Sequence, residues 1–142
     1  MLRMEVWELL WFIYLGLLFC MMWNYKNLEI FERSKKLVKD VYVLADKFPK
    51  NEKYGLVSQI KRAVISVPIN IVEGSGKRTS KDFISYLNIS MGSLKEVQGE
   101  LEIVGDLGFV DEDEIERLIG ECRRIEVMLV AYINYIRGKD VR

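Results

Sequence analysis

The sequence contains no histidine, and only two prolines and two cysteines occur among its 142 residues. The absence of histidine removes the commonest metal ligand and the usual general base of enzymes. Cys20 and Cys122 form no closely spaced pair, so the sequence predicts neither a cysteine metal motif nor a disulfide framework. We therefore expect a cytoplasmic protein without catalytic residues, without a bound metal ion and without a cofactor.

The chain also lacks an overall charge, because 21 basic residues balance 21 acidic ones. The two signs are unevenly distributed along the sequence. Lysine and arginine predominate between residues 33 and 81, whereas aspartate and glutamate predominate between residues 82 and 121. This asymmetry is compatible with a basic face that contacts phosphate groups. It is also compatible with ordinary solvated helix faces and acidic helix starts.

The N-terminus carries an uncharged apolar run over residues 9–23. The run is shorter than the roughly twenty apolar residues of a membrane-spanning helix. It also lacks the basic start and the cleavage site of a signal peptide. Three interpretations stay open: translated upstream sequence before a natural start at Met21 or Met22, a membrane anchor, or an extra helix packed on the rest. We treat residues 1–24 as a separate segment and residues 25–142 as one domain.

Apolar residues recur with helical spacing in four stretches of this domain. The expected helices cover residues 27–47, 52–73, 79–105 and 111–138. The third begins with Thr79 and Asp82, which have the spacing of a capping box. Cys122 has helical spacing with the apolar residues of the fourth, so we expect it to be buried. Short connections make sequential helices antiparallel, and the sequence predicts an all-α, up-down four-helix bundle.

The second expected helix has two unusual features. Pro68 lies inside it, which costs about 3 kcal/mol and requires tertiary contacts to hold the helix. Apolar residues also lie on both sides of a narrow line of polar residues, although a helix in a monomeric bundle needs only one apolar stripe. We therefore expect this helix to be buried against more than its own chain, which indicates a homo-oligomer.

The line of polar residues continues onto the third expected helix, and we call the whole set the polar seam. Its members are Gln59, Arg62, Ser66, Pro68, Asn70, Glu73, Ser93 and Glu96. One interpretation is a ligand-binding or catalytic site. We favour the other, a buried hydrogen-bond network in which Glu73 or Glu96 neutralises Arg62. Ser66 is an improbable nucleophile because no histidine is available and Lys77 lies about three turns away.

Phosphate contacts are expected from basic residues that are clustered in the sequence. The candidates are Lys35, Lys36, Lys39, Lys50, Lys53, Lys77, Arg78 and Lys81. Three of them lie on the first helix, two flank the first loop, and three surround the loop before the third helix. That last loop also offers free backbone N–H groups at a helix start, which suit an anion. Ordinary solubilising charge remains the alternative for each lysine.

The string from Ser66 to Gly74, SVPINIVEG, is distinctive because proline and asparagine rarely occur together inside a helix. Further matching residues are Leu28-Glu29-Ile30-Phe31, Phe48-Pro49, Leu56, Gln59, Ile60, Arg62-Ala63, Phe83, Tyr86-Leu87 and Met91-Gly92-Ser93-Leu94-Lys95-Glu96. In these residues the chain resembles the four-helix-bundle proteins encoded within intervening sequences of bacterial large-subunit ribosomal RNA genes. That family is similar to the accessory variability protein of diversity-generating retroelements.

The resemblance covers roughly residues 25–138 and implies a homopentameric barrel of four-helix protomers that binds nucleic acid without known catalytic activity. The retroelement relatives also bind a reverse transcriptase. The family typically begins close to Tyr25, which favours the later natural start. Nucleic-acid binders of this kind tend to be strongly basic, whereas this chain is neutral. We expect a non-catalytic oligomeric scaffold that associates with RNA or DNA. The alternatives are a protein-interaction scaffold without nucleic acid and a membrane-tethered bundle.

Overall fold

The computed structural model describes residues 5–22, 24–53 and 55–140. The elements are α1 (Val6–Met22), η1 (Tyr25–Asn27), α2 (Glu29–Ala45), η2 (Lys50–Glu52), α3 (Leu56–Ser75), α4 (Ser80–Asp106) and α5 (Glu112–Asp140). The described residues form five α-helices and two short 3-10 helices, with no β-strand among them. The prediction of an all-α protein is therefore confirmed.

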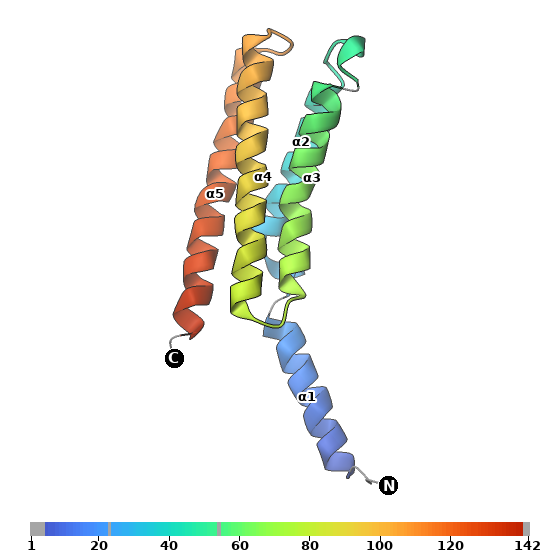
Figure 1. The fold of residues 1–142 in the computed structure, drawn as a ribbon, viewed down its shortest axis with the longest axis vertical. Coiled ribbons are helices and arrows are strands. Elements are labelled where there is room, and N and C mark those ends of the chain that lie inside the picture. Colours follow the sequence, from blue (N-terminus) through green and yellow to red (C-terminus); the bar gives the residue numbers. More distant parts are fainter. Residues whose placement is uncertain (1–4, 23, 54, 141–142) are drawn as a thin grey trace.

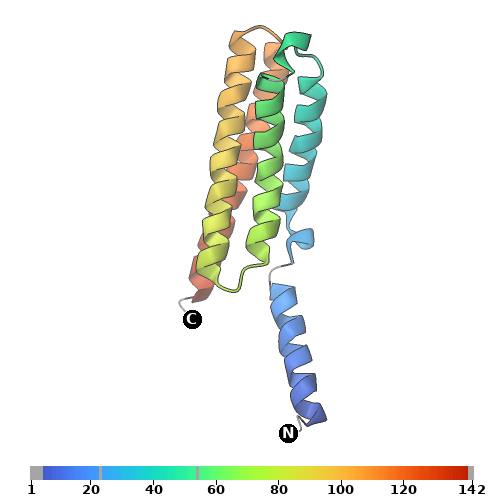
Figure 2. The ribbon, with the colours of Figure 1, turned by 45° about the vertical axis from the view of Figure 1, so that its right-hand side comes forward.

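The four long helices α2 to α5 lie side by side, and each runs antiparallel to the next (Figures 1 and 2). Helix α3 packs against α2 and α4, while α5 packs against α4 and α2. The contact between α3 and α4 is the most extensive. We call α2 to α5 the helical body. Its core consists of apolar side chains from all four helices, among them Leu37, Val67, Leu94 and Leu129, which are fully buried.

Helix α1 projects away from the end of the helical body where the α3–α4 loop lies (Figures 1 and 2). Its large apolar side chains, such as Trp7, Leu10 and Phe12, are exposed. The interpretation of residues 9–23 as a helix packed on the body is therefore wrong for the described part of α1. Apolar residues surround α1 on all sides, so no single stripe directs it onto the body. Within the described ranges, no helix combines the length and apolarity needed to cross a bilayer.

Helix α3 begins later than the sequence predicts. Residues 50–52 form the separate turn η2, and α3 starts at Leu56 rather than at Glu52. The Glu52 carboxylate accepts a hydrogen bond from the backbone N–H of Leu56 (3.4 Å). Glu52 therefore satisfies a donor at the start of α3 instead of belonging to the helix.

Helix α4 has the start that its sequence predicts. The backbone N–H of Asp82 donates to Thr79 Oγ1 (3.1 Å), and the Thr79 hydroxyl donates to Asp82 Oδ2 (2.7 Å). This pairing satisfies one of the free N–H groups of the first turn. Just after α4 ends, Gly108 has a φ of 69°, a left-handed conformation that favours glycine. The turn lets α5 pack back along α4.

Cys122 is a core residue of α5. Its side chain is fully buried, which confirms the prediction from helical spacing. Burial raises the pKa of the Cys122 thiol to about 12, and the neighbouring Glu121 carboxylate adds to the rise. The thiol is therefore neutral and inert at physiological pH.

Candidate nucleic-acid interface

Small polar side chains of the polar seam lie where α3 and α4 meet. The Ser66 and Ser93 hydroxyls are 2.8 Å apart and share a hydrogen bond. The Asn70 side-chain amide donates to the Ser66 carbonyl (2.8 Å) and to the Ser66 hydroxyl (2.9 Å). Deeper in the contact, the buried Ser90 hydroxyl donates to the Val67 carbonyl (2.8 Å). The bonds between Ser66 and Ser93 and from Ser90 to Val67 connect the two helices, whereas the Asn70 amide bonds within α3. Together they satisfy the buried and half-buried polar groups of this contact.

The same contact brings the two backbones close together near Gly74. A Cβ atom at Gly74 would lie 2.7 Å from Phe83 Cδ2 and 2.7 Å from Tyr86 Cβ. Pro68 is buried two turns earlier in α3. The close packing around these residues compensates for the helical hydrogen bond that Pro68 removes. The residues of the distinctive string therefore serve the pairing of α3 with α4.

The charged members of the polar seam lie outside this contact. Arg62, Glu73 and Glu96 are exposed. The Arg62 guanidinium donates to Gln59 Oε1 (2.9 Å), and Glu73 pairs with Lys77 (3.7 Å). The expectation that Arg62 is buried and neutralised by Glu73 or Glu96 is therefore wrong. These three side chains lie at the outer edge of the α3–α4 contact rather than in its interior.

A buried carboxyl that sequence reasoning missed lies on α4 beside this edge. Glu100 is only 9% exposed, and its Oε2 atom is buried without a hydrogen-bond partner in the described part of the chain. Burial raises the pKa of Glu100 from its ordinary 4.5 to about 7. The Glu96 carboxylate raises this pKa further, while the Arg62 guanidinium lowers it. Glu100 is therefore partly protonated at neutral pH.

The candidate lysines of α2 lie on the outer surface of that helix. Lys35 pairs with Glu32 (2.7 Å), and its ammonium group lies 4.9 Å from the centre of the Phe31 ring. Lys36 and Lys39 are exposed and have no ion pair with another described residue. These two ammonium groups are therefore free to contact phosphate.

The other candidates lie at opposite ends of the helical body. Lys50 and Lys53 lie before α3, whereas Lys77, Arg78 and Lys81 surround the loop after it. The 20 residues of α3 separate the two groups by about 30 Å. The candidate basic residues therefore form three separate clusters instead of one continuous patch.

Lys77 is more constrained than the sequence suggests. Its ammonium group lies 4.6 Å from the centre of the Tyr86 ring. A hydrogen bond to Tyr86 is the largest cause of the raised pKa of Lys77. Lys77 thus helps to pack the end of α3 against α4. Arg78 and Lys81 beside it are exposed.

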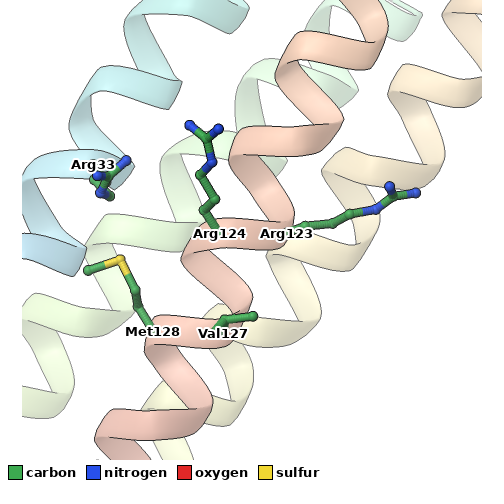
Figure 3. A pocket seen from close by; sticks show the side chains of 5 residues that line it. All are labelled: Arg33, Arg123, Arg124, Val127 and Met128. Atoms are coloured by element: carbon green, nitrogen blue, oxygen red, sulfur yellow. The ribbon is translucent and has the colours of Figure 1, made fainter.

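A groove between α2 and α5 is lined by further basic residues that sequence reasoning missed. Its volume is about 410 Å³, and Figure 3 shows the lining residues Arg33, Arg123, Arg124, Val127 and Met128. Arg33 comes from α2, and the other four come from α5. The sequence signal that could have found this groove is the pair Arg123-Arg124 with Val127 one turn later.

Acidic residues compensate much of the positive charge in this groove. Arg33 pairs with Glu29 and with Glu121, each at 3.0 Å, and Arg124 pairs with Glu121 at 3.4 Å. Hydrogen bonds that the Arg33 guanidinium donates to these two carboxylates raise the pKa of Arg33. The groove is thus less suited to binding a polyanion than the α2 lysines are. In the searched part of the chain, no group of three or more cysteine or acidic side chains could hold a metal ion.

Comparison with known proteins identifies a matching family and a similar solved structure. A family model described as 23S rRNA-intervening sequence protein matches residues 26–131. The fold is similar to a crystal structure from Bacteroides thetaiotaomicron of a protein with unknown function from the S23 ribosomal protein family. The TM-score is 0.65 at 20% identity, and the match covers 73% of this chain and 97% of that chain. This likeness supports the fold alone. No curated protein matches the chain.

Proposed function

Since the chain belongs to the family of 23S rRNA-intervening sequence proteins, we propose that it is a non-catalytic, nucleic-acid-binding protein with RNA as its first ligand. Four-helix bundles built from α2 to α5 would be the protomers of a homo-oligomer. The resemblance of the sequence implies five protomers arranged as a barrel. DNA is the second ligand to test.

The outer surface of α2 is the observation that carries the RNA-binding part of this proposal. Lys36 and Lys39 are exposed there without an ion pair to any described residue, and Lys35 lies beside them. Lysine ammonium groups that approach phosphates release counterions from the nucleic acid, which favours binding. The α2 lysines therefore provide a phosphate contact that needs no rearrangement of the protein.

The neutral charge of the chain makes oligomerisation part of the mechanism. A single protomer with 21 basic and 21 acidic residues is expected to bind RNA weakly. An oligomer repeats the α2 surface, so one RNA can contact several copies and gain effective concentration. Weak contacts per protomer then sum to useful affinity, and no strongly basic surface is required.

Exposed isoleucines support the proposed oligomer. Ile65 and Ile69 of α3 are 39% and 53% exposed, and Ile89 and Ile103 of α4 are 49% and 50% exposed. Ile65 and Ile69 are among the apolar residues that lie beside the line of polar residues of α3, and Ile89 and Ile103 lie on the outer surface of the adjacent α4. Apolar groups gathered on one face of a protein are typical of a protein–protein contact. A neighbouring protomer would remove them from water.

The test is a titration of end-labelled RNA, single-stranded and hairpin, with the full chain at several salt concentrations. We expect fluorescence anisotropy to show binding that weakens steeply as salt rises. Lys36→Gln/Lys39→Gln should reduce both the affinity and the salt dependence. The matched control Arg137→Gln/Lys139→Gln removes the same charge at the end of α5 and should bind like the wild type. Binding that ignores salt, or that both double variants weaken equally, would contradict the α2 site.

Light scattering on the same samples tests the oligomer. We expect a mass several times that of one 16.7 kDa chain. A clean oligomer that ignores RNA and DNA at every salt concentration would reject nucleic-acid binding. That result would favour the alternative of a scaffold for protein partners.

A further inference from the structure

The outer surface of α4 carries a second stripe of regularly spaced residues. Ile89, Gly92, Glu96, Gly99 and Ile103 recur at alternating steps of three and four, which is the spacing of a coiled-coil seam. An added Cβ atom at Gly92 or Gly99 would meet no atom within 4 Å. We call these five residues the outer stripe of α4. The stripe has the spacing of a helix-packing surface, although no described helix of this chain covers it.

The glycines give the stripe a specific shape. Two shallow positions at Gly92 and Gly99 alternate with the exposed side chains of Ile89, Glu96 and Ile103. Small residues at such positions let a second helix approach closely, and its larger side chains then fill the shallow positions. The complementary helix should therefore present branched apolar side chains at helical spacing.

Helix α5 presents such a surface on its own outer side. Val127 and Val130 are 67% and 47% exposed, and Arg123 lies about one turn before Val127 and two turns before Val130. We call these three residues the outer stripe of α5. In Figure 3 the Arg123 side chain extends away from Arg33 and Arg124. Arg123 forms no hydrogen bond or ion pair with any described residue. Its neighbour Glu126, which it attracts electrostatically, is held by Lys95 at 2.7 Å.

The two stripes are also complementary in charge. Glu96 is exposed and has no ion pair within the described ranges. An exposed carboxylate and an exposed guanidinium that meet at a contact attract each other, and this favours one pairing of surfaces over others. Arg123 is the complementary cation, since it is exposed and forms no ion pair with a described residue.

The residues of the two outer stripes lie at matching levels along the axis of the helical body. The contact between Lys95 and Glu126 sets the register of antiparallel α4 and α5. At 1.5 Å per residue, Arg123 then lies within about one turn of the level of Glu96 and Glu100. By the same register, Val130 lies near the level of Gly92. A neighbouring copy placed alongside without an axial shift would therefore align the two stripes.

We propose that the outer stripe of α4 binds the outer stripe of α5 of a second copy, with Arg123 of that copy beside Glu96. This inference rests on the proposed homo-oligomer and names the surfaces through which its copies meet. The contact joins two different surfaces, so each copy uses one stripe on each neighbour. A contact of this heterologous kind closes into a ring when its rotation allows it.

A charge exchange in the full chain tests the contact. Arg123→Glu and Glu96→Arg each place like charges at the interface, and we expect each to raise the dissociation constant of the oligomer at least tenfold. The double variant Arg123→Glu/Glu96→Arg restores opposite charges and should return most of the wild-type mass in light scattering. Arg137→Glu makes the same charge change near the end of α5 and should leave the mass unchanged. Thermal melts of each variant separate loss of assembly from loss of folding.

The outcomes distinguish this inference from the proposed function. A wild-type chain that is monomeric at all concentrations overturns the homo-oligomer and this contact together. A wild-type oligomer that both single variants leave intact overturns the contact alone. A double variant that stays dissociated also overturns the pairing of Arg123 with Glu96.

Cysteine cross-linking provides a second measurement that does not depend on charge. The variant Gly92→Cys/Val130→Cys should form disulfide-linked ladders under mild oxidation, because the proposed contact brings the two positions together between copies. Gly92→Cys and Val130→Cys alone serve as controls for the native cysteines. Ladders that are no stronger in the double variant than in the controls would overturn the contact.

Discussion

The α3–α4 contact and the α2–α5 contact hold the same helical body together by different means. Between α3 and α4 small polar side chains make the connection: the half-buried Ser66 and Ser93 hydroxyls share a hydrogen bond, and the buried Ser90 hydroxyl donates to the Val67 carbonyl. Between α2 and α5 long side chains reach across the surface, and Arg33 pairs with Glu121 while Asp40 pairs with Arg117. The first contact buries the Ser90 hydroxyl completely, whereas the second leaves a groove at its side.

This difference indicates where substitutions are tolerated. In a closely packed contact, adding atoms or removing buried hydrogen-bond partners lowers the free energy of unfolding. An exposed ion pair contributes only about 0–1 kcal/mol, because water screens it and the long side chains lose entropy. The α3–α4 contact should therefore carry most of the specific stability, while the α2–α5 surface can vary.

The largest effect is expected from Gly74→Ala. The new Cβ atom would lie 2.7 Å from atoms of both Phe83 and Tyr86, so one helix must move away from the other. We expect the free energy of unfolding to fall by about 3 kcal/mol, as in other overpacked contacts. Gly120→Ala on α5 is the control, because a Cβ atom there meets nothing within 4 Å. It should stabilise the helix by up to about 1 kcal/mol. Urea unfolding of both variants measures the difference.

The second effect is a pH dependence that comes from Glu100. Its folded-state pKa is raised from 4.5 to about 7, so the folded protein retains a proton that the unfolded chain releases between these values. Stability is therefore highest below pH 4.5 with respect to this group and falls as the pH rises to 7. The full shift corresponds to about 3 kcal/mol. Because one edge of the residue still contacts water, we expect about 2 kcal/mol.

Glu100→Gln should remove this part of the pH dependence and leave the protein more stable at pH 8. Glu102→Gln is the matched control on the exposed side of α4. Its unfolding free energy should follow the same pH profile as that of the wild type. Parallel profiles for wild type and Glu100→Gln between pH 4.5 and 7 would reject the role of Glu100.

The third effect compares two fully buried serines. Ser90 donates to the Val67 carbonyl on another helix, whereas Ser34 donates to the Ile30 carbonyl of its own helix. Ser90→Ala should cost about 1 kcal/mol, the usual contribution of a buried hydrogen bond. Ser34→Ala should cost less, because its bond competes with the helix and alanine has the higher helix propensity. Equal losses of stability in thermal unfolding would show that the hydrogen bond between helices contributes no more than the one within a helix.

The sequence predicted which residues of α3 share a face better than it predicted how deeply each of them is buried. Helical periodicity placed Ser66 and Asn70 on one face, and it assigned Arg62 and Glu73 to the same line. Only the position of α4 separates the buried part of that line from its exposed edge. Glu100 was missed for the same reason, since it occurs in a stretch rich in acidic residues. Its burial depends on how α4 packs against α3.

The α2–α5 surface was less predictable because it depends on contacts between distant residues. Arg33 and Glu121 are separated by 88 positions, and their pairing requires the register of two antiparallel helices. The distance between the basic loops, in contrast, could have been inferred. Two loops at opposite ends of a 20-residue helix lie about 30 Å apart in any such fold.

The smallest effect is expected from the ion pair between Asp40 and Arg117 (3.1 Å). A double-mutant cycle with Asp40→Asn and Arg117→Gln should give a coupling energy of about 0.5 kcal/mol at low salt. Because the Arg117 side chain is largely exposed, added salt screens the pair. The coupling measured in urea unfolding should therefore become undetectable at about 1 M salt. A coupling above about 2 kcal/mol that survives high salt would mean that α2 and α5 are joined as specifically as α3 and α4.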